Sequence, residues 1–418
     1  MVTTETLPSG LRLVTEHMPH VRSVTVGVWL TRGSRHESDQ ESGVAHFVEH
    51  MLFKGTTTRS ARDIAQTIDS IGGQLDAFTA KEYASYYVKV LDEHLPVAMN
   101  LLSDMIIRPA LAPGDVTKEQ GVILEEIKMV EDAPDDLVHE IFAQQFWSKH
   151  PLGRPILGTP ETVASFASEG LRRYFNRTYV APNLIIAAAG NAEHARIRDL
   201  VFAAFEELGS QARTEASEVP DITPGVAARH KDIEQNHLCL GSRAYPQAHA
   251  SRYALYLLNT ILGGSMSSRL FQHIREERGL AYAVFSNLTT YSDTGTITIY
   301  AGCAVDKTNE VVALALAEMR NLRDTAVAPD ELRRAKDHLK GSLMLGLEST
   351  SSRMSHIARQ EIYFHRHFSL DEMLQAIENV TAEAVQRVAQ DLFVDGSLVA
   401  TLVGPKTDRP LTVDALRI

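Results

Sequence analysis

The segment Gly43–Gly55, GVAHFVEHMLFKG, is the most informative stretch of this chain. Its apolar residues recur at helical spacing, so we predict a helix over residues 43–53. Three polar side chains, His46, Glu49 and His50, interrupt this otherwise apolar run. Polar groups are costly to bury without partners, so their presence in such a helix calls for a functional explanation.

The two histidines are spaced for binding one metal ion. Residues four apart on a helix lie on one face, with Cβ atoms roughly 5–6 Å apart. Two imidazoles placed in this way can bind one zinc ion at about 2.0–2.1 Å. Glu49 lies on the same arc, where it can reach a water molecule on the metal without being a ligand. The pattern H-x-x-E-H is typical of zinc peptidases. A solvated helix face would also explain these polar residues.

The third ligand has to come from another element, because a catalytic zinc usually has three protein ligands and one open position. The acidic helical stretch Glu119–Asp136 is the best source. Within it, Glu119 and Glu126 are seven residues apart and so lie two turns apart on one helix face. Spacing alone does not choose among Glu119, Glu125, Glu126 and Glu131.

The order of predicted elements repeats along the chain. The strand-like stretch His237–Ser242 takes the place of the one from Val24 onwards, so that Gly241 falls opposite Gly27, 214 residues earlier (241 − 27). One repeat of this length is not a solenoid period. It predicts two copies of one α+β domain, although any two α+β segments share some likeness.

We therefore expect a catalytic, metal-binding domain over residues 1–212, a linker over 213–229 and a second domain over 230–418. Each domain is predicted to be an α/β sandwich with a mixed or antiparallel sheet and helices on one face, and the pair to form a clamshell. In the second copy, Thr260 and Gly264 stand where the first has His46 and His50. The second domain is thus expected to bind substrate but no metal.

Composition excludes several classes of protein. The formal charge of −12 argues against a nucleic-acid partner, because such proteins usually carry a basic surface. Two cysteines, Cys239 and Cys303, do not make a disulfide framework and favour a reducing compartment. No apolar run approaches the length of a membrane span, and the first residues do not resemble a targeting sequence. We expect a cytoplasmic protein of a bacterium, or a mitochondrial matrix protein if a presequence has been removed.

The sequence resembles the inverted-motif zinc peptidases, the family of insulin-degrading enzyme, pitrilysin and the mitochondrial processing peptidase, and is most similar to its short two-domain bacterial branch. In that family H-x-x-E-H is followed by a glutamate ligand in a segment like E-x-x-V-I-x-x-E, matched here by residues 119–126. The resemblance implies one zinc ion per chain, held by His46, His50 and Glu126. It further implies Glu49 as the base, with Glu119 as a carboxylate behind the ligands.

Two further stretches are similar to this family. Arg275 and Tyr282, seven residues apart, match a pair that holds the substrate backbone near the zinc. The stretch Leu75, Asp76, Ala77, Phe78 and Thr79 resembles the edge strand to which substrates add as an extra strand. Family members often have Asn where this chain has Asp76, but strand addition depends on main-chain groups.

These features predict a zinc-dependent endopeptidase that cleaves unfolded peptides or presequence-like segments, basic ones among them, by attack of a water molecule activated by Glu49. The short loop over residues 263–268 favours a catalytic subunit that works as a homodimer. The main alternative is a noncatalytic assembly or partner-dependent subunit of the same fold. A zinc hydrolase of small molecules and a zinc-storage protein would also be compatible with the metal motif.

Overall fold

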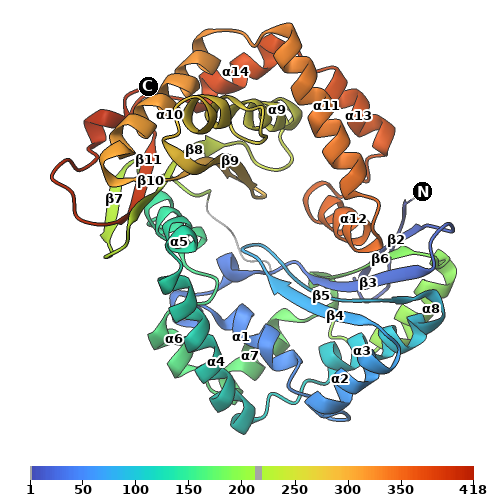
Figure 1. The fold of residues 1–418 in the computed structure, drawn as a ribbon. Helices are drawn as coiled ribbons and strands as arrows, with labels where there is room; N and C mark the ends of the chain where they lie inside the picture. Colours follow the sequence, from blue (N-terminus) through green and yellow to red (C-terminus); the bar gives the residue numbers. More distant parts are fainter. Residues whose placement is uncertain (1, 212–218) are drawn as a thin grey trace. The chain divides into compact units, whose positions relative to one another are not determined.

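The computed structural model describes residues 2–211 and 219–418, which form two compact units. Neither unit is one continuous stretch of chain, and the colours of Figure 1 follow the chain from one unit to the other. Unit 1 comprises Met1–Lys128, Arg154–Ser217 and Leu345–His367, and unit 2 comprises Met129–Gly153, Glu218–Met344 and Phe368–Ile418.

Unit 1 contains a six-stranded mixed sheet in the order β1-β2-β6-β3-β5-β4. Strands β2 and β6 are parallel, and the other neighbours are antiparallel. The fully buried strand β6 has the apolar sequence LIIAAAG, as expected for a strand covered on both faces. The strands are β1 Val2–Thr6, β2 Arg12–His17, β3 Ser23–Leu30, β4 Gln74–Thr79, β5 Ala84–Leu91 and β6 Leu184–Gly190.

Unit 2 contains a five-stranded sheet in the order β7-β11-β8-β10-β9, in which β7 and β11 are the parallel pair. This order matches β2-β6-β3-β5-β4 strand for strand, and the parallel pair stands at the same place. The predicted fold class is therefore confirmed, as two mixed sheets of one topology. The strands are β7 Gly225–His230, β8 Gln235–Ala244, β9 Ala281–Thr290, β10 Gly295–Ala304 and β11 Val399–Gly404.

One face of each sheet packs on a large helical layer. In unit 1 the core joins alternate residues of β3 to apolar residues of α1, α3 and α8. In unit 2 the core joins β8 and β10 to α9, α10 and α14. The helices of unit 1 are α1 Val44–Leu52, α2 Ala61–Ser70, α3 Leu95–Ile107, α6 Pro160–Ser165, α7 Ser168–Thr178, α8 His194–Phe205 and α12 Thr350–Phe364. Those of unit 2 are α5 Pro134–Phe146, α9 Arg252–Leu262, α10 Thr308–Asp324, α13 Leu370–Glu378 and α14 Ala382–Leu392. Two of the unit boundaries fall within helices, one in α4 Pro113–Asp132 and one in α11 Pro329–Gly346.

The other face of each sheet carries one helix that comes from the opposite half of the chain (Figure 1). In unit 1, α12 packs Met354 and Ile357 against Trp29. In unit 2, α5 packs Phe142 and Leu137 against the outer face of β8 and β11. The prediction of helices on one face was thus incomplete, because an amphipathic pattern does not reveal which sheet a helix covers.

Glycines make room for these two helices. A Cβ atom on Gly27 would lie 3.0 Å from Met354 Sδ, and one on Gly241 would lie 2.5 Å from Phe142 Cζ. Real Cβ contacts are longer than the second distance, so α5 can approach β8 this closely only over a glycine. The repeat predicted from the sequence aligned these same two glycines.

The units differ from the expected contiguous halves, 1–212 and 230–418, by the exchange of α5 and α12. Residues 225–229 of the expected linker belong to strand β7, and residues 213–218 of it lie outside the described part of the chain. In the part of the chain that the structure describes, no helix combines the length and the apolar character needed to cross a bilayer.

Candidate metal centre

Helix α1 is anchored at its N-terminus by a carboxylate from the preceding loop. Gly43 adopts φ of +93° at the N-cap position, which favours glycine. The buried carboxylate of Glu37 accepts hydrogen bonds from the backbone N–H groups of Gly43 and Ala45, both at 2.8 Å. These bonds satisfy amide groups that a helix start leaves unpaired.

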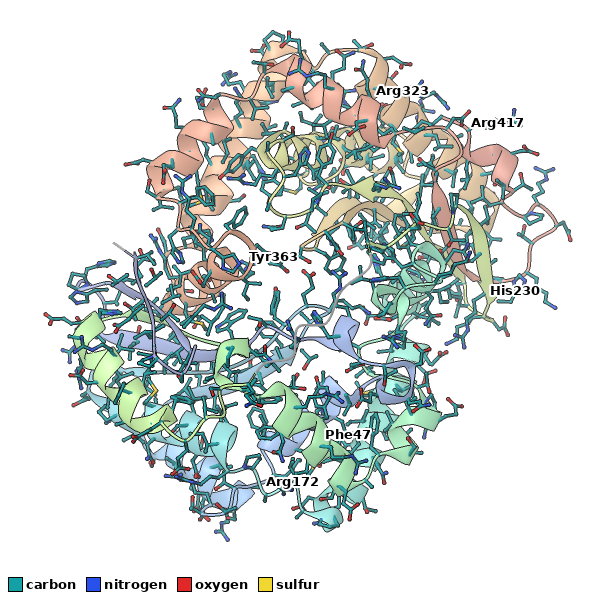
Figure 2. The ribbon with its side chains drawn as sticks, turned by 180° about the vertical axis from the view of Figure 1, so that it is seen from behind. Phe47, Arg172, His230, Arg323, Tyr363 and Arg417 are labelled. Atoms are coloured by element: carbon teal, nitrogen blue, oxygen red, sulfur yellow. The ribbon has the colours of Figure 1, made fainter. Side chains whose placement is uncertain are left out.

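The apolar side of α1 lies in the core of unit 1. Phe47, Val48 and Met51 are fully buried, and Figure 2 labels Phe47 among the helices of this unit. His46, Glu49 and His50 are half-buried on the remaining side of the helix. The apolar side therefore fixes the rotation of α1, and this rotation brings the three polar residues together.

Helix α4 supplies the third group. The ligand atoms of His46, His50 and Glu126 lie within 4.8 Å of one another. Glu126 places one carboxylate oxygen 3.7 Å from His46 Nε2 and the other 3.6 Å from His50 Nε2. Of the four carboxylates left open by the spacing, Glu125 instead pairs with Lys128, at 2.6 Å. Glu131 belongs to unit 2.

Glu119 contacts the side of the His50 ring that faces away from Glu126. Its buried carboxylate contacts His50 Nδ1 at 3.1 Å and Lys54 Nζ at 2.7 Å. A carboxylate on Nδ1 holds the proton there and leaves Nε2 of His50 as the lone-pair donor that faces Glu126. Such a partner is typical of metal-binding histidines, because it fixes both the tautomer and the ring orientation.

The protonation of His46 suits a metal ligand. Desolvation, with a smaller contribution from the neighbouring His50, lowers the pKa of His46 to about 4. The ring is therefore neutral near pH 7, as metal binding requires. Its Nδ1 is buried and has no hydrogen-bond partner among the described residues. Two imidazoles and one carboxylate are a donor set that fits zinc, with a further position open.

Glu49 has the environment of a general base. Burial raises its pKa, and a hydrogen bond from Thr79 and the nearby His50 partly offset that increase. Thr79 Oγ1 donates to Glu49 Oε2 at 2.5 Å. A carboxyl group with a raised pKa is a better proton acceptor near neutral pH than an ordinary glutamate.

Sequence reasoning did not find the roles of Glu37 and of the Thr79 side chain. Glu37 precedes α1 by several residues, and an acidic residue before a helix start was the only available signal. Thr79 was considered for its main chain alone. Its hydroxyl meets Glu49 because β4 packs beside α1, and this contact joins residues 30 positions apart.

Strand β4 is at an edge of its sheet, as predicted for the residues 75–79. Among the strands that the structure describes it pairs with β5 alone, and its side chains alternate between half-buried and exposed. Asp76 accepts a hydrogen bond from Tyr87 at 3.1 Å and another from the Ala77 N–H at 2.8 Å. The exposed Phe78 contacts Trp29 edge-on. Strand addition by a substrate at this edge stays a prediction.

Arg275 and Tyr282 lie in unit 2, at the end of a π-helical turn over Phe271–Glu276 and the start of β9. The Arg275 guanidinium stacks on the ring of Phe271 at 4.7 Å and on that of Tyr282 at 5.1 Å. Tyr282 is 81% exposed, so its hydroxyl is accessible. The two predicted partners are thus brought together, while their contact with substrate stays a prediction.

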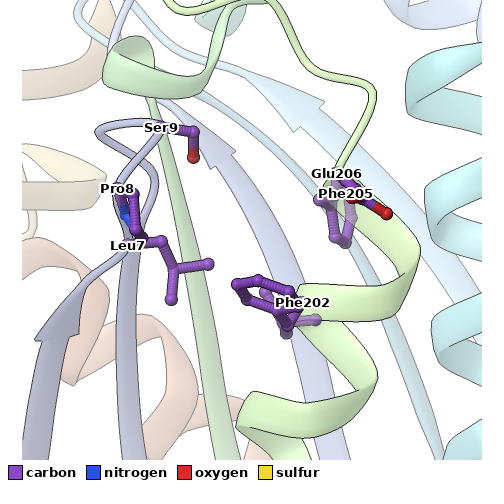
Figure 3. Close-up of a pocket in the computed structure, with 7 residues that line it drawn as sticks. Leu7, Pro8, Ser9, Phe202, Phe205 and Glu206 are labelled. Carbon is purple, nitrogen blue, oxygen red and sulfur yellow. The ribbon is translucent and has the colours of Figure 1, made fainter.

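A small apolar cavity of about 170 Å³ lies elsewhere in unit 1, between α8 and the turn after β1 (Figure 3). None of the three candidate ligands and neither Glu49 nor Glu119 lines it. The cavity is lined by Leu7, Pro8, Ser9, Val201, Phe202, Phe205 and Glu206. It therefore adds nothing to the metal centre.

Comparison with known proteins identifies the family of this chain. The family described as "Insulinase (Peptidase family M16)" matches residues 12–160, and the family described as "Peptidase M16 inactive domain" matches residues 165–339. An uncharacterized zinc protease of Bacillus subtilis is 42% identical over 412 residues, which cover 98% of this chain and 100% of that protein. The chain belongs to the insulinase family of peptidases, family M16.

Other relatives extend this result. An uncharacterized zinc protease of Streptomyces coelicolor is 41% identical, over 97% of this chain and 90% of that protein. Among solved structures, a protease from Helicobacter pylori has a TM-score of 0.88 at 22% identity, over 97% of this chain and 100% of that chain. A peptidase M16 inactive domain from Pseudomonas fluorescens has a TM-score of 0.92 at 18% identity, over 98% and 100%. The two structures support the fold alone.

Family membership also agrees with the asymmetry of the two halves. The segment that matches the inactive domain contains Thr260 and Gly264 in place of the histidine pair. The names of the relatives and the family support a zinc peptidase. The substrate and the reaction of this chain are not given by those names.

Proposed function

We propose that this protein is a zinc-dependent endopeptidase with one zinc ion per chain, acting on extended, unstructured peptides. The observation that carries the proposal is the meeting of His46, His50 and Glu126 with Glu49 beside them on the same helix. A site that only stored zinc would have no use for a half-buried carboxylate with a raised pKa next to the ligands.

His46, His50 and Glu126 would hold the metal, which when bound supplies a Lewis acid that lowers the pKa of water and polarises a carbonyl. Glu49 accepts a proton at its carboxylate from the attacking water and gives it to the nitrogen of the leaving amine. Glu119 keeps His50 in the tautomer that presents Nε2. Thr79 Oγ1 donates a hydrogen bond to the Glu49 carboxylate.

The substrate would be held mainly through its backbone. An edge strand offers unpaired N–H and C=O groups to an extended peptide, and this mode of binding depends little on side-chain sequence. In the proposal, β4 supplies that edge, and Arg275 and Tyr282 bind the peptide backbone. We also propose that the protein acts as a homodimer, which a molar mass from light scattering would test.

The first experiment measures zinc content and cleavage of an unstructured basic peptide for the wild type, Glu49→Gln and Glu125→Gln. Glu125 is exposed and paired with Lys128, so its variant is the matched control. We expect about one zinc ion in all three proteins and loss of cleavage only in Glu49→Gln. Zinc binding without cleavage in the wild type would favour the noncatalytic subunit instead. Absence of zinc would overturn the ligand assignment.

A panel of small esters, tested with the same three proteins, separates a peptidase from a hydrolase of small molecules. Hydrolysis of esters that depends on Glu49, without cleavage of any peptide, would show that the metal centre is active but that the substrate class is wrong.

A further inference from the structure

Thr79 connects the edge strand to the catalytic side of α1. It is the last residue of β4, and its Oγ1 donates to Glu49 Oε2 at 2.5 Å. Among the described residues, no other hydrogen-bond donor contacts the Glu49 carboxylate. A glutamate side chain has several rotatable bonds, and fixing it costs rotamer entropy. The hydroxyl of Thr79 is therefore the group that selects one orientation of this carboxylate.

The main-chain N–H and C=O groups of Thr79 point toward the open edge of the sheet. The Ala80 N–H donates to the Tyr83 C=O at 2.8 Å, so one hydrogen bond joins this pair, while the Ala80 C=O accepts from the Ser34 N–H at 3.2 Å. In an antiparallel ladder hydrogen-bonded pairs alternate with pairs that do not exchange hydrogen bonds. Thr79, opposite Ala84, thus points its N–H and C=O away from β5.

The same alternation is visible two residues earlier. The N–H of Ala77 also points away from β5, and it is bonded there by the Asp76 carboxylate at 2.8 Å. The outward direction of the backbone at Ala77 and Thr79 is thus supported by a contact as well as by the register.

We propose that Thr79 is a positioning residue, which orients the Glu49 carboxylate through its hydroxyl while its main chain lies at the edge where an extended peptide adds. This inference rests on the proposed function, in which Glu49 is the base. One residue then sets both the position of the peptide strand and the direction of the proton acceptor. Misalignment of either would reduce turnover without removing a metal ligand.

The test compares Thr79→Val, Thr79→Ser and the wild type, with Thr67→Val as a matched control. Valine keeps the β-branched shape and strand preference of threonine but has no hydroxyl, whereas serine keeps the hydroxyl. Thr67 lies on α2, and its hydroxyl bonds to the backbone of Asp63, away from the metal centre. Zinc content, kcat and KM for a peptide, and crystal structures of the variants are measured.

We expect Thr79→Val to keep its zinc, to change KM by less than about threefold and to lose about 10–100-fold in kcat, a part of what general-base catalysis contributes. Thr79→Ser should restore kcat to within about threefold of the wild type. The crystal structure of Thr79→Val should show the Glu49 carboxylate rotated away from residue 79, and that of Thr79→Ser should show it in place.

An unchanged kcat in Thr79→Val, failure of serine to restore it, or an unmoved Glu49 carboxylate would overturn the proposal. A loss of zinc in Thr79→Val would overturn it as well, because the residue would then support the ligands. If the wild type holds zinc and cuts no peptide, the proposed function fails instead. The orientation of Glu49 in the crystal structures still decides whether Thr79 positions it.

Discussion

Glu37 is a buried acid whose removal should change how the stability of unit 1 depends on pH. It is 4% exposed, and desolvation raises its pKa from 4.5 to about 7. Hydrogen bonds from the N–H groups of Ala45 and Gly43 and the charge of Arg154 oppose that increase. The folded protein therefore binds a proton at Glu37 more tightly than the unfolded chain does.

The sign and size of the effect follow from this difference. Because the folded pKa lies above the unfolded one, the stabilising contribution is fully present below pH 4.5 and is lost as the pH rises through 7. For these two values, linkage gives a loss of about 2–3 kcal/mol between pH 5 and pH 8. In Glu37→Gln the side chain is neutral throughout, so this part of the pH dependence disappears.

The assay is urea unfolding of the metal-free protein at pH 5, 6, 7 and 8, since zinc binding has a pH dependence of its own. In a Trp147→Phe background, the fluorescence of Trp29 reports on unit 1, because Trp147 belongs to unit 2. We expect the free energy of unfolding of the wild type to fall by about 2–3 kcal/mol more than that of Glu37→Gln over this range. Parallel stability curves for the two proteins would refute the reasoning, because Glu37 would then have an ordinary pKa in the fold.

Two further predictions concern the ligand layer and the exchanged helices. Glu119→Gln should weaken zinc binding about 10–100-fold, because a neutral amide supports His50 Nδ1 less well than a carboxylate. Competition with a chelator measures the zinc affinity. An affinity of Glu119→Gln equal to that of Glu125→Gln would contradict the prediction. Gly241→Ala should lower the free energy of unfolding by about 1–3 kcal/mol, since the added Cβ would lie 2.5 Å from Phe142 Cζ. Gly341→Ala in α11, where a Cβ meets nothing within 4 Å, should not destabilise the protein in thermal unfolding, and equal effects of the two substitutions would contradict the packing argument.

The sequence was informative wherever the relevant residues are close together in the chain. His46, Glu49 and His50 lie within two turns of one helix, so their relative positions follow from helix geometry alone. The strand-like stretches predicted at Ser23–Leu30 and His237–Ser242 are strand β3 and a part of strand β8. The two-fold repeat could be found because the equivalent strands of the two halves have similar sequence patterns. Gly27 and Gly241 occupy equivalent positions in them.

Tertiary structure decided what depends on contacts between distant segments. Helical spacing could not choose between Glu119 and Glu126, and the packing of α4 beside α1 makes Glu126 a candidate ligand and Glu119 the partner of His50. The hydrogen bond from Thr79 to Glu49 and the exchange of α5 and α12 between the units are of the same kind. The local sequence pattern determines which side of a helix or strand is apolar. Which other element packs against that side depends on the packing of the whole core. This chain's sequence therefore determined the chemistry of its metal motif, and its fold decided which residues complete and orient it.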